Sequence, residues 1–93
     1  MNGLGKYGRM AQKYLKEEHN KRYNELLESG ELLPMLHKVE EDANNYLDEL
    51  TKELLKKDPI KDPHNFWETA QHKLKIKAIA EEFVLKEIIY IPR

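Results

Sequence analysis

The sequence predicts an all-α protein, a small helical bundle in which two short helices precede a long antiparallel helical hairpin. Apolar residues recur at helical spacing, β-branched residues are few outside the C-terminus, and glycine and proline divide the chain into segments of helix length. The 93 residues suit one domain, 1–93. We expect residues 1–6 to be disordered, because Gly3 and Gly5 leave little to pack.

The longest expected helix has the clearest apolar pattern, with spacings of four, three, four, three and four residues. Its members are Leu32, Leu36, Val39, Ala43, Tyr46 and Leu50, and the pattern continues to Leu54. Such positions line up on one face of a helix. Pro34 is tolerated only in a first turn, so this helix begins no earlier than about Glu31 and ends near Lys57.

Two shorter helices are expected before it, over about 8–19 and 20–29. Asn20 marks the break between them, because asparagine favours helix caps over helix interiors. Gly30 suits the left-handed position that ends the second helix.

The last helix is expected over 63–89, with Asp62 as its cap and Pro63 in its first turn. A short extended ending after Glu87 is the alternative, because the tail is β-branched. Lys77 and Glu81 are expected to pair with each other.

The apolar residues of this helix fall into two groups. One group is Phe66, Trp67, Ala70, Leu74, Val84, Leu85 and Ile88. A monomeric amphipathic helix needs only one stripe. The second group therefore predicts a central helix or a homodimer. We favour the homodimer, with a candidate interface formed by Ile76, Ile79, Ala80, Phe83, Ile89 and Tyr90.

Charge is unevenly distributed along the chain. Residues 1–24 contain six bases and two acids, whereas residues 25–58 contain ten acids and four bases. The basic set is a candidate nucleic-acid contact and comprises Lys6, Arg9, Lys13, Lys16, Lys21 and Arg22. The net charge of −1 argues against DNA binding, and the same bases could instead face the acidic helix within the chain or a dimer.

No residue pattern indicates a reaction. The chain has no cysteine, which excludes disulfides and thiolate chemistry. His64, Glu68 and His72 share a helix face, but a metal site in a helical bundle also needs ligands from facing helices. We therefore expect no catalytic residues, no metal and no cofactor. Without an apolar run of membrane-spanning length or a signal-peptide core, we expect a cytoplasmic protein with no membrane contact.

Several segments, taken together and in order, resemble the transposon-encoded protein TnpV family. They are Gly5-Lys6-Tyr7-Gly8-Arg9-Met10, Tyr14-Leu15, Tyr23 with Leu26-Leu27, Ser29-Gly30 with Leu32, Ala80-Glu81-Glu82 and Lys86-Glu87-Ile88-Ile89-Tyr90. The resemblance implies an all-helical bacterial protein carried on mobile elements, and it brings no catalytic residues with it. Members often have more residues before the first segment, so whether residues precede Met1 in the natural protein stays open.

The resemblance and the surplus apolar surface together predict a function. We expect a non-enzymatic accessory protein of a transposon or conjugative element that acts through protein–protein contacts as a homo-oligomer. Its partners would be a second copy and other transposon-encoded proteins. The alternative is a DNA-binding accessory or regulatory protein that uses the basic N-terminal helices.

Overall fold

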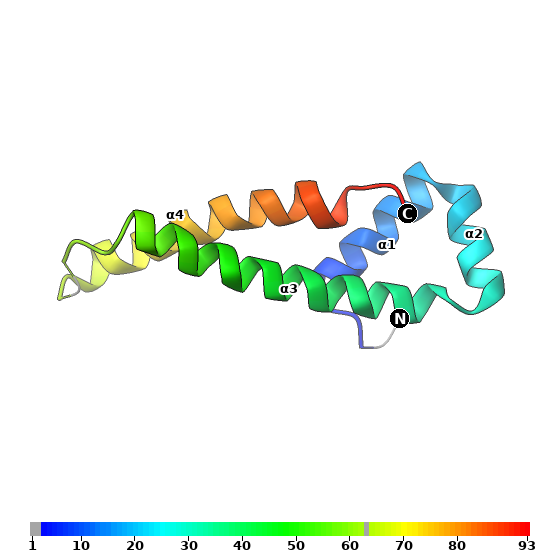
Figure 1. The fold of residues 1–93 in the computed structure, drawn as a ribbon, viewed down its shortest axis with the longest axis horizontal. Helices are drawn as coiled ribbons and strands as arrows, with labels where there is room; N and C mark the ends of the chain where they lie inside the picture. The colour runs from blue at the N-terminus through cyan, green and yellow to red at the C-terminus, as the bar shows by residue number, and fades with distance from the viewer. Residues whose placement is uncertain (1–2, 63) are drawn as a thin grey trace.

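The computed structural model describes residues 3–62 and 64–93, and this part of the chain is helical without strands. Helices α1 (Lys6–Glu18), α2 (Asn20–Ser29), α3 (Leu32–Lys57) and α4 (Phe66–Val84) are followed by a π-helical turn, η1 (Leu85–Ile89). As Figure 1 shows, α3 and α4 form a long hairpin, and α1 and α2 cover only one half of it. The predicted all-α bundle of two short helices and a hairpin is confirmed.

The turn between α2 and α3 follows from Gly30. Its φ of +78° is in the left-handed region, where glycine meets no Cβ penalty. The Gly30 N–H donates to the carbonyl of Leu27 at 3.3 Å, and the Glu31 N–H donates to that of Leu26 at 3.1 Å. This pair of bonds is a Schellman motif, which satisfies the last carbonyls of α2. The predicted role of Gly30 is confirmed.

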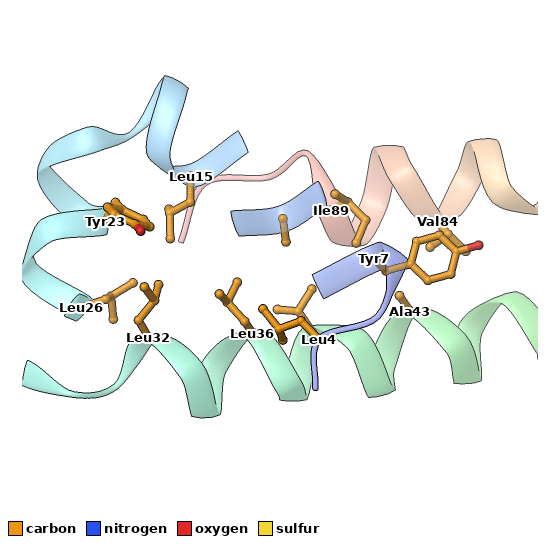
Figure 2. Packing of buried hydrophobic residues seen from close by; sticks show 12 residues of the cluster. Leu4, Tyr7, Leu15, Tyr23, Leu26, Leu32, Leu36, Ala43, Val84 and Ile89 are labelled. Carbon is orange, nitrogen blue, oxygen red and sulfur yellow. The ribbon is translucent and has the colours of Figure 1, made fainter. Parts of the chain in front are cut away.

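The hydrophobic core lies in the covered half of the hairpin. Figure 2 shows it where α1, α2, the start of α3 and the end of α4 meet. Its members include Leu4, Tyr7, Ala11, Leu15, Tyr23, Leu26, Leu32, Leu36, Val39, Ala43, Val84 and Ile89. Within the 1–6 segment that we expected to be disordered, Leu4 is only 7% exposed and Lys6 already belongs to α1. Met1 and Asn2 lie outside the described residues.

Helix α1 packs on α3 through a close approach at two glycines. The Glu40 carboxylate on α3 accepts a hydrogen bond from the Gly8 N–H, one of the first-turn donors of α1 that no α1 carbonyl can reach. A Cβ at Gly5 would lie 2.8 Å from Glu40 Cδ, and one at Gly8 would lie 3.0 Å from Leu4. Both glycines therefore make room for the carboxylate that caps α1.

Helix α4 begins later than expected. Its cap is Asn65, whose side chain accepts a hydrogen bond from the Glu68 N–H at 3.1 Å. Asp62, the predicted cap, accepts from the His64 N–H at 3.1 Å instead, so that prediction is wrong. Pro63 lies outside the described residues.

The C-terminal residues continue as a π-helical turn and not as a strand. Ile76, Ala80 and Val84 are spaced by four residues and are all buried. A regular α-helix would turn Ile89 away from this face, but the π turn, with its i to i+5 bonding, brings it back. Tyr90 N–H donates to the Leu85 carbonyl at 2.8 Å, which is the bond expected of such a turn. The extended alternative after Glu87 is therefore wrong.

Candidate interaction surface

We use the name hairpin tip for residues 44–57 of α3 and 66–79 of α4, the half of the hairpin that extends beyond α1 (Figure 1). A groove of about 470 Å³ runs along it between the two helices. The lining residues are Asn44, Leu47, Asp48, Thr51, Leu55, Lys73, Ile76 and Lys77. Three of these are large aliphatic residues, so much of the groove is apolar.

The groove is open because α1 begins only where the groove ends. Lys6, the first residue of α1, pairs with Glu81 of α4, and Gly8 is held by Glu40 of α3. Tyr7, Ala11 and Leu15 bury the hairpin's inner surface from that point on. Beyond α1 only α3 and α4 remain. Two packed helices cannot enclose the apolar contact between them, so one side of it stays open to water.

Large apolar side chains are also exposed on α4, outside the lining of the groove. Phe66 is 85% exposed, Trp67 71% and Leu74 67%. Trp67 and Leu74 are seven residues apart and therefore share a helix face. Large apolar patches exposed on a protein surface often mark interaction sites.

The edges of the groove carry opposite charges. Asp48 stands on the α3 side, where it forms a 3.0 Å ion pair with Lys52, and Lys73 and Lys77 stand on the α4 side. Within residues 3–62 and 64–93, neither Lys73 nor Lys77 has an ion-pair partner. Glu81, the predicted partner of Lys77, pairs with Lys6 instead, and this hydrogen bond raises the pKa of Lys6. The predicted Lys77–Glu81 pair is therefore wrong.

Some residues of the predicted oligomer interface are buried inside the chain, and others are at least partly exposed. Ile76, Ala80 and Ile89 are 2%, 0% and 0% exposed, because they pack inside the chain's own bundle. Of these three, Ile76 also lines the groove. Ile79 is half-buried, while Phe83 and Tyr90 are exposed. The grouping was wrong because Val84 lies on the same buried face as Ile76 and Ala80.

Two of the six predicted nucleic-acid contacts form salt bridges within the chain. Lys6 is occupied by Glu81, and Arg22 donates to the Arg93 carbonyl at 2.9 Å and pairs with Glu25. The others are Arg9, Lys13, Lys16 and Lys21, and all four are exposed. Arg9, Lys13 and Lys16 are spaced by four and three residues, so they form one basic face of α1.

The histidines do not come together into a ligand set in the described part of the chain. His72 Nε2 lies 2.6 Å from the Asp58 carbonyl oxygen and is thereby engaged with the end of α3. In the same described residues, no helix is long and apolar enough to cross a membrane.

Sequence reasoning did not single out the hairpin tip. Phe66, Trp67 and Leu74 were grouped with Val84, but these three side chains are exposed whereas Val84 is buried. A signal was available in the lengths of the elements. The 13 residues of α1 cannot cover the 26 residues of α3.

Comparison with protein families gives a match to the family described as transposon-encoded protein TnpV, over residues 1–89. Comparison with curated proteins and with solved structures found no match. The family match spans nearly the whole chain, including all four helices and the π turn. The chain therefore belongs to the transposon-encoded protein TnpV family.

Proposed function

We propose that this TnpV family protein is a non-enzymatic accessory protein of its transposon that acts through protein–protein contacts as a helical homo-oligomer. The observation that carries the proposal is the uncovered apolar surface of the hairpin tip, which combines the groove with the mostly exposed side chains of Trp67 and Leu74 on α4. Burial of such a surface against another protein is the main driving force of association.

The shape of the chain supports this proposal. The radius of gyration is 16.4 Å, whereas a compact domain of this length has about 12 Å. The accessible surface is 6685 Å², and a compact monomer of the same mass has about 5,700 Å². The surplus of about 1,000 Å² is comparable to the ~800 Å² that each partner contributes to a standard interface.

Sedimentation equilibrium over a range of protein concentrations tests the proposal. We expect the mass to rise from that of one 11.1 kDa chain to twice that value or more. A mass that stays at one chain up to high micromolar concentration would contradict the homo-oligomer.

The exposed basic face of α1 favours DNA binding as a second candidate function. Arg9, Lys13 and Lys16 could neutralise three backbone phosphates, which predicts a slope of about −2.7 in log K against log salt. An electrophoretic shift assay with duplex DNA at several salt concentrations measures this slope. The matched variant is Lys13→Glu, which should reduce binding without touching the core, since Lys13 is exposed. Failure to bind even at low salt removes this candidate.

A further inference from the structure

We infer that the groove of the hairpin tip receives helix α4 of a second copy of this chain, in a symmetric dimer. This inference rests on the proposed function, and it assigns the partner and the contact surface. Each copy would place its Phe66, Trp67 and Leu74 face against the partner's groove and would receive the same face in return.

The apolar surfaces match in kind. The groove offers Leu47, Leu55 and Ile76 from two helices. The same type of surface already accepts a helix elsewhere in the chain, because α1 packs Tyr7, Ala11 and Leu15 against the covered half of the hairpin. A second helix in the open half would repeat this packing and complete a four-helix bundle.

Charge complementarity identifies the incoming helix as α4. Residues 66–79 contain three lysines and one glutamate, whereas residues 40–53 of α3 contain six acids and one lysine. A partner's α4 would therefore bring lysines to the acidic side of the groove, beside Asp48. Lys73 and Lys77, which lack ion-pair partners among the described residues, would then acquire them.

The position of α1 determines how two copies can overlap. Because α1 covers the hairpin from Glu40 toward α2, a second hairpin has room only over the tip.

The sequence contains one tryptophan, Trp67, which makes the test possible on the unmodified protein. We expect its fluorescence to shift to the blue, and its quenching by acrylamide to fall, at the same concentrations at which sedimentation shows the mass doubling. Doubling of the mass with Trp67 still fully quenched would overturn the assigned surface while leaving the homo-oligomer intact. A mass that never doubles would overturn the proposed function and this inference together.

A matched pair of variants tests the surface directly. Leu74→Glu should raise the dimer dissociation constant at least about tenfold. Leu27→Glu is the control, because Leu27 on α2 is similarly exposed, at 52%, but lies outside the hairpin tip. Both variants should keep the helical circular dichroism of the parent chain, since neither side chain is buried. An equal effect of the two substitutions, or no effect of Leu74→Glu, would refute the assignment.

A charge exchange tests which helix enters the groove. Asp48→Lys should weaken the dimer, and addition of Lys73→Glu and Lys77→Glu in the same chain should restore it at least in part. Within the described part of one chain, Asp48 pairs with Lys52 and not with either lysine across the groove, so a restored contact would form between copies. Lack of restoration, with both proteins folded, would overturn the pairing of α4 with the partner's α3.

Discussion

Replacement of Gly5 by alanine tests how α1 is attached to α3. Gly5 has a φ of −83°, which alanine adopts without strain, so the backbone itself does not oppose the substitution. The three heavy atoms nearest to an added Cβ all belong to the Glu40 carboxyl group. The methyl group would therefore displace the carboxylate that accepts the Gly8 N–H.

The size of the effect follows from that lost hydrogen bond. A hydrogen bond to a charged group contributes about 1.5–3 kcal/mol. Alanine also restricts the unfolded chain more than glycine does, which raises the free energy of unfolding by about 0.4–1 kcal/mol. We therefore expect Gly5→Ala to lower the free energy of unfolding by about 1–2 kcal/mol. In a Glu40→Ala chain the methyl group has room, so the same substitution should change stability by less than about 1 kcal/mol.

Urea unfolding of the four chains, followed by circular dichroism at one fixed protein concentration, measures this double-mutant cycle. A fixed concentration is needed because association stabilises the folded chain. The reasoning is refuted if Gly5→Ala costs the same free energy with and without Glu40, since the cost would then have another origin.

Further expected outcomes concern the α2–α3 turn, α4 and alkaline pH. Gly30→Ala should destabilise the chain by about 1 kcal/mol or more in urea unfolding, because its φ is +78°; Gly30→Asn should cost less, and an equal cost would contradict the backbone argument. Ile76→Ala should cost about 2–5 kcal/mol, whereas Leu74→Ala, measured at a concentration where the chain is monomeric, should stay within about 0.5 kcal/mol; similar values would contradict the observed orientation of α4. The hydrogen bond from the Tyr46 hydroxyl to the Glu87 carboxylate raises the pKa of Tyr46, so the folded state retains this proton longer than the unfolded state. Stability should therefore fall as pH rises above about 10. Tyr46→Phe should make the urea midpoint less dependent on pH in that range, and an unchanged slope would show that other groups dominate.

The sequence alone located the helices, apart from the start of α4 and the π turn. Helix periodicity located all four helices, and Gly30 predicted the end of α2 because its special conformation is a property of the residue itself. The family was also recognisable, since its short segments occur in order along the chain. These features depend on neighbouring residues, which the sequence displays directly.

Only the tertiary structure decided which side of α4 is buried and where the chain stays open. Ile89 joins Val84 in the core because of a π turn, which periodicity at 3.6 residues per turn does not predict. Glu40 reaches Gly8 across 32 residues of sequence, and Glu81 pairs with Lys6 and not with the neighbouring Lys77. Such contacts depend on how the helices are placed in space, and that placement leaves the hairpin tip uncovered.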